Sequence, residues 1–360
     1  MRILFILEYY YPHIGGVEKL FKMLCEELVA DGHEVTVLTN RYKRTLPGRE
    51  VVNGVRIRRL GFYNRYFFTF FSLLHAWFYA GKADVIHTTS FNAALPAYFA
   101  SRLRNKKIFI TFHEAWGKLW FKLPFIGYFS KWLFYHYERY ILRLSFMKFI
   151  AVSDYTKRCL IEQGVPAERV MRIYNGVDYQ TNAVFHHNDP SDFVFTYFGR
   201  LGPSKGADIL VPAALSFLKE NPGAKLKMII PREENEIFRF VTKTMMNSPV
   251  KDQVLFLHEL SREDLFREIT HSSCVVIPSY SEGFCFAAAE TIALGVPLIS
   301  SAQGALKEVV SGRFLEMQSM EAKSLYSCLN EAKDEKWKTR ELKKFEMPDC
   351  IDAYRELYNQ

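Results

Sequence analysis

The first half of the chain repeats one order of apolar and polar positions. The apolar run Ile3–Leu7 is followed by Gly15-Gly16, after which apolar residues recur every three or four positions as far as Leu28. This order predicts a buried strand, a glycine turn and an amphipathic helix. Further strands are predicted at Val35–Leu38, Val55–Arg58, Asp84–His87, Ile108–Phe112 and Phe149–Val152. Ser153 follows the last strand as the predicted N-cap of another helix.

The same order begins again near residue 192. A predicted strand at Phe193–Tyr197 leads into the glycine-rich basic loop Gly199–Gly206, and residues 209–218 have helical spacing. Further strands are predicted at Leu226–Ile230, Val254–Leu257, Cys274–Ile277 and Pro297–Ser300. Strands that alternate with helices indicate parallel βαβ units. We therefore expect an α/β protein with two Rossmann-like domains facing one another across a cleft.

The expected domain limits follow from a polar stretch between the two halves. Residues Tyr179–Ser191 look like a linker. The N-terminal domain is expected at residues 1–178 and the C-terminal domain at residues 190–345. Residues 346–360 contain a short helix, Asp349–Leu357, which is expected to return to the first domain. The length of 360 residues agrees with two domains, because single cores stop growing beyond roughly 250–300 residues.

Composition narrows the class of protein only slightly. The six cysteines include no CxxC pair, which favours reduced core residues of a cytosolic protein. The N-terminus lacks the pattern of a signal peptide. The longest apolar run, Tyr66–Ala80, falls short of the roughly 20 residues of a spanning helix, so no transmembrane helix is expected. A net charge of +8 is compatible with nucleic acid or an anionic membrane as partner.

The loop Gly199–Gly206 carries the first candidate chemistry. Its glycines let backbone amides approach an anion, and Arg200 and Lys205 add positive charge beside the start of a helix. Such a loop suits a diphosphate, although a surface turn with two solvated cations would look the same. The glycine spacing of this loop matches neither the GxGxxG pattern nor the phosphate loop of nucleoside triphosphatases. Gly15-Gly16 is a weaker candidate of the same kind, since a simple tight turn explains it equally well.

Two carboxylates frame the second candidate, the segment EGFCFAAAE from Glu282 to Glu290. Its alanines favour a helix that starts near Gly283. The free amides of that helix would then belong to Gly283, Phe284, Cys285 and Phe286. Glu282 and Glu290 could accept paired hydroxyls of one ligand. The alternative is that Glu282 only complements the helix dipole while Glu290 is solvated.

Several short motifs in one order give the chain a family resemblance. They are Gly15-Gly16-Val17-Glu18, Thr111-Phe112-His113-Glu114, Ala151-Val152-Ser153, Asn175-Gly176-Val177-Asp178, Gly199-Arg200-Leu201 with Lys205-Gly206, Pro278-Ser279 before EGFCFAAAE, Gly295-Val296-Pro297 and Glu308. The chain resembles the family 4 retaining glycosyltransferases, which have the two-domain GT-B fold. The resemblance runs through most of the sequence.

The resemblance implies roles for the candidate residues. Arg200 and Lys205 would bind the donor diphosphate, Glu282 the donor sugar and Glu290 the ribose. His113 would lie at the donor-sugar end of the first domain, where the residues alone would equally allow a core histidine. Amides near Gly16 would approach the phosphate or the acceptor. The anomeric configuration would be retained, with neither cofactor nor metal, and the sequence contains no DxD triplet.

The sequence departs from the family pattern at three places. Cys285 stands where the family usually has a second glycine. Pro231-Arg232-Glu233 replaces a glycine-rich turn, and His258 replaces a common glycine before the nucleobase pocket. These departures lie in segments that the resemblance expects to contact the donor sugar and the nucleobase.

Aromatic and basic residues gather in two stretches of the first domain. The stretch Trp116–Phe149 contains nine tryptophan, tyrosine and phenylalanine residues between positions 116 and 135. It also contains six lysines and arginines, and Tyr66–Tyr79 adds a second aromatic stretch. Interfacial helices combine such residues, so we expect the domain to dock on an anionic membrane. The alternative is that many of these aromatic residues belong to the core or to a dimer contact.

The leading interpretation is a transferase that moves a sugar from a UDP- or GDP-linked donor to a glycan or a lipid-linked acceptor. It would act in cell-surface polysaccharide or glycolipid synthesis, in the cytoplasm and on the cytoplasmic face of the membrane, without nucleic acid as a partner. A GT-B epimerase or hydrolase of nucleotide sugars is a second interpretation. A non-catalytic membrane-binding module is a third.

Overall fold

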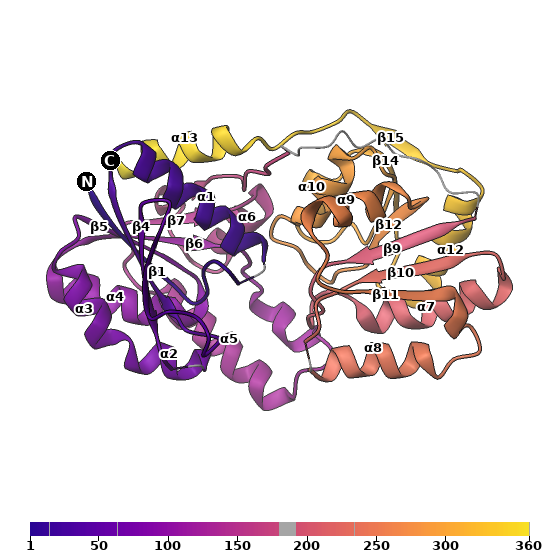
Figure 1. Cartoon of the computed structure of the whole chain (residues 1–360), viewed down its shortest axis with the longest axis horizontal. Helices are drawn as coiled ribbons and strands as arrows, with labels where there is room; N and C mark the ends of the chain where they lie inside the picture. Colours follow the sequence, from indigo (N-terminus) through magenta and orange to yellow (C-terminus); the bar gives the residue numbers. More distant parts are fainter. Residues whose placement is uncertain (14, 63, 180–191, 234, 360) are drawn as a thin grey trace. The chain divides into compact units, whose positions relative to one another are not determined.

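The computed structural model describes residues 1–13, 15–62, 64–179, 192–233 and 235–359. Most of the predicted linker, residues 180–191, therefore lies outside the described residues. The chain forms two compact units (Figure 1). Unit 1 comprises Met1–Trp120, Trp132–Gly176 and Glu346–Gln360, and unit 2 comprises Phe121–Lys131 and Val177–Phe345.

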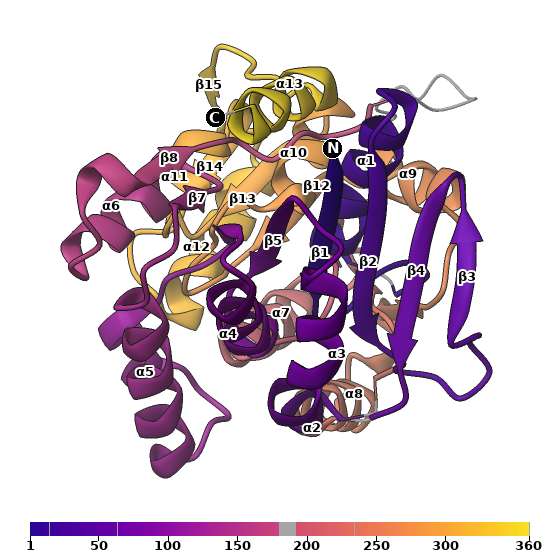
Figure 2. The same ribbon diagram turned by 90° about the vertical axis from the view of Figure 1, so that its left-hand side faces the viewer.

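Unit 1 is built on an eight-stranded sheet with the order β3-β4-β2-β1-β5-β6-β7-β8 (Figure 2). The strands are β1 (Arg2–Leu7), β2 (Glu34–Asn40), β3 (Arg49–Val52), β4 (Val55–Leu60), β5 (Val85–Thr89), β6 (Lys107–Phe112), β7 (Lys148–Ala151) and β8 (Val170–Arg172). Neighbouring strands are parallel, except that β3 runs antiparallel to β4. The central strands are buried on both faces, as is usual for parallel sheets.

Alternating side chains of the sheet face two layers of helices. The helices are α1 (Gly16–Ala30), α2 (Arg65–Phe71), α3 (Leu73–Ala80), α4 (Ala94–Arg104), α5 (Tyr128–Leu142), α6 (Asp154–Glu162) and α13 (Met347–Tyr358). Leu4 and Ile6 of β1 share a core with apolar residues of α2, α3 and α4. Phe5, between them, contacts Phe21 of α1 and Tyr358 of α13 on the other face.

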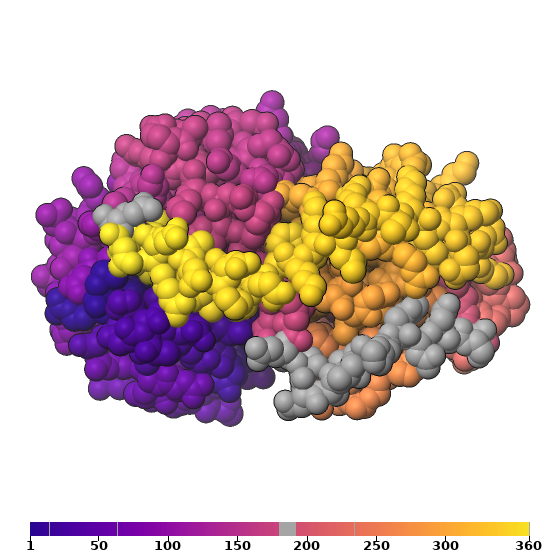
Figure 3. Space-filling model, turned by 90° about the horizontal axis from the view of Figure 1, so that it is seen from above, coloured from indigo at the N-terminus to yellow at the C-terminus, as the bar shows by residue number. Residues whose placement is uncertain are grey.

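Helix α13 packs against the sheet of unit 1 and forms polar contacts there. The hydroxyl of Tyr358 lies 2.6 Å from Nδ1 of His87, and the hydroxyl of Tyr354 lies 3.1 Å from that of Thr111. At the surface, Arg355 pairs with Asp31 at 2.6 Å. The space-filling view shows this last helix lying on the atoms of unit 1 (Figure 3). A segment distant in sequence therefore completes the core of the unit.

Unit 2 contains a seven-stranded sheet with the order β11-β10-β9-β12-β13-β14-β15. The strands are β9 (Val194–Phe198), β10 (Lys225–Ile229), β11 (Val254–Leu257), β12 (Cys274–Ile277), β13 (Leu298–Ser300), β14 (Gly312–Glu316) and β15 (Lys338–Arg340). The helices are α7 (Ala207–Glu220), α8 (Glu236–Met246), α9 (Arg262–Thr270), α10 (Phe286–Ala293), α11 (Leu306–Val309) and α12 (Ala322–Lys333). Helices α7, α8 and α12 contribute to the main apolar core on one face of this sheet.

Every strand predicted from the apolar runs is confirmed, with ends that differ by at most two residues. Ser153 caps α6, since its hydroxyl accepts a bond from the amide of Thr156. The structure adds β3, β8 and β15 at sheet edges, and it adds β14 beside the edge strand β15. None of the six cysteines, all of which the structure describes, forms a disulfide, and only Cys159 is not buried. In the described part of the chain, no helix combines the length and apolar character needed to cross a membrane.

Candidate active site

In the sheet of unit 2, the order in which the chain adds strands changes direction between β9 and β12. From β9 the chain continues to β10 and β11 on one side, whereas β12 is followed by β13 and β14 on the other. The loops after β9 and β12 therefore leave the same edge of the sheet in opposite directions. Ligands of open α/β sheets bind at such switch points, outside the carboxyl ends of the strands.

The loop after β9 is the predicted glycine-rich segment, and it lies directly against the loop after β12. Gly206 caps α7 with a φ of 71°, and a Cβ atom built there would lie only 2.0 Å from the carbonyl oxygen of Pro278. The amide of Tyr280 donates to the carbonyl of Ser204 at 2.7 Å. Only glycine permits this close approach. The backbone thus joins the two loops into one site.

Lys205 and Glu282, predicted from separate motifs, form an ion pair in this site. The Nζ atom of Lys205 lies 2.8 Å from Oε1 and 2.9 Å from Oε2 of Glu282. The hydroxyl of Ser279 donates to Oε1 at 2.7 Å. Glu282 is only 5% exposed, so this carboxylate is held in place before any ligand arrives. Arg200 lies on the same loop with an exposed side chain.

The predicted start of the helix in EGFCFAAAE is wrong by three residues. Helix α10 begins at Phe286, and Cys285 is its N-cap with a φ of 77°. This left-handed conformation cannot continue a right-handed helix, so Gly283, Phe284 and Cys285 precede it. The amides of Ala288 and Ala289 already donate to the carbonyl of Cys285. Glu290 therefore lies about one turn inside the helix.

The conformation of Cys285 gives a physical reason for the glycine that the resemblance led us to expect. Positive φ values are unstrained for glycine and cost an ordinary residue roughly 1–2 kcal/mol. The chain keeps this conformation with a side chain that is 9% exposed. The side chain of Cys285 therefore fills space at this turn that a glycine would leave open.

His113 lies in unit 1, immediately after β6. Its Nε2 atom is buried and has no hydrogen-bond partner among the described residues. Burial lowers the pKa of His113 to about 4, and the negative charge of Glu18 opposes this shift only in part. The imidazole is therefore neutral at neutral pH, with one buried ring nitrogen still able to bind a polar group.

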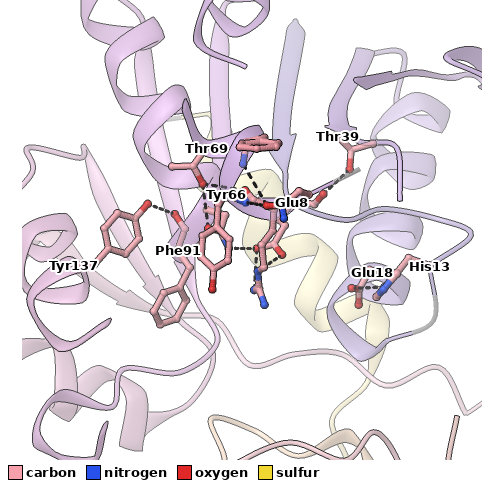
Figure 4. A network of polar contacts seen from close by, with 12 residues as sticks. Glu8, His13, Glu18, Thr39, Tyr66, Thr69, Phe91 and Tyr137 are labelled. Atoms are coloured by element: carbon pink, nitrogen blue, oxygen red, sulfur yellow. Dashed lines mark hydrogen bonds and ion pairs between the residues drawn. The ribbon is translucent and has the colours of Figure 1, made fainter. Parts of the chain in front are cut away.

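Gly15 and Gly16 lie where the chain passes from β1 to α1. Gly15 is the N-cap of α1 and Gly16 is its first residue. Nearby, Nδ1 of His13 lies 2.8 Å from the carboxylate of Glu18, a contact visible at the right of Figure 4. Glu18 is 6% exposed. The contact between His13 and Glu18 thus joins the two ends of the predicted glycine loop. The sequence did not indicate this contact.

A polar cluster in unit 1 was missed at the sequence level (Figure 4). Glu8 follows β1, and its carboxylate lies 2.9 Å from Nε of Arg65 and 2.7 Å from Nδ2 of Asn92. The Oδ1 atom of Asn92 accepts a bond from Thr69 at 3.0 Å. Asn40, the last residue of β2, is 1% exposed. The available signal was that Glu8 and Asn40 are polar residues at the carboxyl ends of predicted strands.

The aromatic stretches divide between core and surface. Trp120 is 6% exposed and donates to the buried carboxylate of Glu138, so this part of Trp116–Phe149 belongs to the core. Burial raises the pKa of Glu138, while amides of residues 116 and 117 and the Trp120 indole oppose the shift. Tyr128 and Phe129 at the start of α5 are 75% and 74% exposed. The exposed aromatic residues of α2 and α3 are Tyr66, Phe67, Phe70, Phe71, Trp77 and Phe78.

The two halves of the sequence match two glycosyltransferase families. Residues 14–181 match the family described as Glycosyltransferase Family 4, and residues 179–334 match Glycosyl transferases group 1. The chain belongs to the family 4-like glycosyltransferases. An uncharacterized glycosyltransferase of Methanocaldococcus jannaschii is 26% identical over 337 residues, which are 86% of this chain and 83% of that protein.

Solved structures of glycosyltransferases share the fold along the whole chain. Sucrose-phosphate synthase from Thermosynechococcus elongatus superposes with a TM-score of 0.78 at 18% identity, over 100% of this chain and 99% of that one. Anabaena HepE in complex with UDP-glucose gives a TM-score of 0.75 at 16% identity, with the same coverage of 100% and 99%. The glycosyltransferase therefore has the GT-B fold, as the sequence predicted.

Among the predicted site residues, the structure brings Lys205 and Glu282 into direct contact. Arg200 lies on the same loop as Lys205, and Gly283, Phe284 and Cys285 connect Glu282 to α10. Gly199 belongs to the same loop as Arg200, and Phe286 and Glu290 lie on α10. The last three predicted residues, Gly15, Gly16 and His113, belong to unit 1. In the described residues, no group of three or more His, Cys, Asp and Glu side chains is arranged to hold a metal ion.

Proposed function

We propose that this glycosyltransferase moves a sugar from a UDP- or GDP-linked donor to a lipid-linked or glycan acceptor, with retention of the anomeric configuration. The observation that carries the proposal is the contact between Lys205 and Glu282 at the switch point of unit 2. A cation for the diphosphate and a carboxylate for sugar hydroxyls stand side by side there. HepE, which shares the fold, was solved with UDP-glucose.

Donor binding would exchange partners within this pair. The ammonium group of Lys205 would turn from the carboxylate to the diphosphate, and the carboxylate oxygens of Glu282 would then accept sugar hydroxyls. Arg200 is exposed on the same loop and would add a second positive charge. Charge-assisted hydrogen bonds of this kind are about twice as strong as neutral ones. Glu290, on α10, would bind the ribose.

The reaction needs stabilisation of negative charge on the leaving diphosphate. The acceptor oxygen would form a bond to the anomeric carbon while the bond to the diphosphate breaks, and the acceptor proton would pass to a diphosphate oxygen. Lys205, Arg200 and the first amides of α10 would stabilise that charge. We propose that these groups act without a metal ion or a cofactor. The neutral His113 would bind a donor-sugar hydroxyl through its buried Nε2.

We further propose that the enzyme works on an anionic membrane surface, on the cytoplasmic side, in the synthesis of a cell-surface polysaccharide or glycolipid. Four aromatic residues of the seven-residue helix α2 are between 50% and 71% exposed. The net charge of +8 complements an anionic surface. Cysteines without disulfides, as the described residues have them, are typical of a reducing compartment. Failure to float with anionic vesicles at low salt would contradict this part of the proposal.

The donor site is tested by measuring nucleotide affinity in the wild type and in Lys205→Ala. Calorimetric titration with UDP, GDP, ADP and CMP is preferable to thermal shift, because the substitution also leaves the buried carboxylate of Glu282 unpaired. We expect UDP or GDP to bind, and the substitution to weaken binding by about 1.5–3 kcal/mol. Lys225→Ala is a matched control, since this lysine pairs with Asp192 at the surface of the same unit.

The same titration separates the rival functions. Binding of none of the four nucleotides would favour a non-catalytic module, and unchanged affinity in Lys205→Ala would exclude the proposed diphosphate site. Product analysis with a radiolabelled donor then distinguishes transfer from epimerisation and hydrolysis. Labelled sugar on an extracted lipid or glycan is the expected product.

A further inference from the structure

The chain leaves strand β6 through a turn that has no regular backbone structure. His113 directly follows β6, and residues 113–116 belong to neither a helix nor a strand. The 3-10 helix η2 (Gly117–Lys122) begins after them. The position of the His113 side chain therefore depends on what holds the residues that follow it. Residues 113–117 are called the β6 turn below.

The carboxylate of Glu138, on α5, holds the β6 turn through hydrogen bonds. Its Oε1 atom accepts a bond from the amide of Gly117 at 2.6 Å. Its Oε2 atom accepts bonds from the amide of Trp116 at 3.1 Å and from the indole N–H of Trp120 at 3.2 Å. Glu138 is 1% exposed, and hydrogen bonds to an ionised acceptor are strong where water is excluded. One side chain thus fixes three donors at the end of the turn.

A second side chain restrains the same turn. Gln163, the C-cap of α6, donates from Nε2 to the carbonyl of Ala115 at 3.4 Å. Gly117 has a φ of 50°, and a Cβ atom built there would lie 3.0 Å from the side chain of Gln163. Glycine therefore suits this position both for its conformation and for the close approach. Glu138 and Gln163 together leave the β6 turn little freedom.

Helix α5 is itself fixed beside Glu138. The hydroxyl of Tyr137 donates to the carbonyl of Phe91 at 3.1 Å, as Figure 4 shows. The ring of Phe91 meets that of Trp120 edge to face, with 5.8 Å between the centroids. Phe91 begins the short 3-10 helix after β5. The carboxylate is therefore held relative to the segment after β5 as well as to the β6 turn.

A buried carboxylate at this place is costly. Burial disfavours the charged form, and an apolar side chain would fill the same space without that penalty. An apolar side chain, however, would leave two amides and an indole N–H without an acceptor. In the proposed reaction His113 binds the donor sugar, whereas Glu138 contacts no reacting group. The cost is explained if the turn that follows His113 has to keep one conformation.

We infer that Glu138 is a positioning residue for the transfer reaction: through the β6 turn, it holds the imidazole of His113 at the place where the donor sugar would bind. The inference rests on the proposed function, to which it adds a residue that acts without touching the substrate. A change at Glu138 should therefore lower turnover only through His113, and it should leave the diphosphate site of unit 2 unaffected. These two consequences distinguish positioning from a general contribution to stability.

The first test is Glu138→Gln, which keeps the shape of the side chain. A carboxamide has a single acceptor oxygen, so its own N–H groups must face at least one of the three donors. In the whole chain, the amides of Trp116 and Gly117 should exchange hydrogen with solvent about tenfold faster than in the wild type, relative to the amides of β6. Nuclear magnetic resonance measures these amides individually. Unchanged relative exchange would overturn the inference.

A double-mutant cycle with His113 tests the route of the effect. Release of UDP or GDP from UDP-glucose, UDP-N-acetylglucosamine and GDP-mannose reports turnover by transfer or hydrolysis. Glu138→Gln should lower kcat about tenfold and leave the calorimetric affinity for UDP or GDP unchanged. In the His113→Gln background, the same substitution should lower kcat less than about twofold. Losses that multiply in the double variant would overturn the inference.

Two further variants keep the test conclusive. Trp120→Phe removes one of the three donors, and it takes the place of Glu138→Gln where that variant does not fold. It should lower kcat about threefold, and this loss should disappear in the His113→Gln background. Glu26→Gln is the matched control, because this glutamate accepts a bond from Asn53 elsewhere in unit 1. A control that loses as much turnover as Glu138→Gln would overturn the assignment.

The same measurements separate this inference from the proposed function. A wild type that neither binds UDP or GDP nor turns over any of these donors would overturn the transferase proposal, even where Glu138→Gln speeds exchange in the β6 turn. A wild type that turns over a donor while the losses of the two substitutions multiply would overturn the positioning role alone.

Discussion

At the scale of single residues, the structure explains which positions of the site tolerate change. Glu282 is buried and receives bonds from Lys205 and Ser279, so its orientation does not depend on a ligand. Cys285 holds a conformation that glycine would adopt without strain. His113 combines a lowered pKa with a buried Nε2 that has no hydrogen-bond partner in the described part of the chain. Each of these properties leads to a measurable difference between variants.

The positive φ of Cys285 predicts opposite tolerance to two substitutions. Cys285→Val should lower the free energy of unfolding by roughly 1–3 kcal/mol, because β-branched residues are outliers in the left-handed region. Cys285→Gly should stay within about 1 kcal/mol of the wild type, since relief of strain and the greater entropy of the unfolded chain oppose each other. Urea denaturation measures both values.

A control for Cys285 is available in helix α6. Cys159→Val makes the same change at a helical position that is partly exposed, where it should cost only about 0.5 kcal/mol. Equal losses for valine at both positions would show that the conformation of Cys285 does not limit the choice of side chain.

The lowered pKa of His113 predicts a loss of stability on acidification. Its pKa is about 4 in the folded chain against the ordinary value of 6.5, so the unfolded chain binds the proton more readily. The contribution is complete above pH 6.5 and is lost as the pH falls towards 4. Each pKa unit corresponds to about 1.4 kcal/mol, so the loss is on the order of 1–3 kcal/mol.

Comparison with His113→Gln isolates this contribution from other titrating groups. Burial also lowers the pKa of His87, to about 3, and His113 adds to that shift. The free energy of unfolding should therefore fall more steeply between pH 6.5 and 4.5 in the wild type than in the variant. His75→Gln, at an exposed position, should follow the wild type. Parallel curves for wild type and His113→Gln would refute the prediction.

At the scale of elements, helix α2 departs from what folding alone would select. Only Phe68 and Thr69 of its seven residues are buried. The exposed phenylalanines contribute little to the core, yet they would add favourable free energy on contact with an apolar phase. The helix is thus positioned by its N-cap, Asn64, and by the Arg65–Glu8 pair rather than by extensive packing.

Removing the exposed aromatic rings of α2 should separate membrane binding from folding. The double substitution Phe67→Ser and Phe70→Ser should weaken binding to phosphatidylglycerol vesicles about tenfold or more, if each ring contributes roughly 1 kcal/mol on burial. The melting temperature should change little, because both side chains are exposed. Flotation measures the binding.

Leu342→Ser provides the control for an exposed apolar residue in unit 2, where the side chain is 61% exposed. This variant should float as the wild type does. Unchanged flotation of the α2 variant would place the membrane contact elsewhere, and the exposed residues Tyr128 and Phe129 of α5 would then be the next to test.

At the scale of the whole molecule, the sequence predicted the fold more fully than the site. Apolar runs such as Ile108–Phe112 identify buried parallel strands, since both faces of those strands are covered. Edge strands such as β3 and β15 lack this signal because they are mostly exposed. The start of α10 was misplaced because alanine propensity outweighed the left-handed Cys285, whose conformation no single-residue preference reveals.

Site residues were predictable where each of them belongs to a short motif that can be recognised in the sequence. The Lys205–Glu282 contact joins two motifs that were each visible in the sequence. The Glu8 cluster joins residues from four separate segments of unit 1, and only one of these segments, the aromatic helix α2, has a distinctive composition. Such a site depends on strand order, which the linear pattern does not specify.

The return of α13 to unit 1 has a consequence for how the protein is made. Phe5 and His87, on strands translated early, are covered by Tyr358, which is translated only after all of unit 2. While the ribosome synthesises unit 2, Phe21 of α1 can cover part of this face, but α13 is missing and the remaining apolar surface is open to chaperones. The half of the protein that emerges first is therefore the half that matures last.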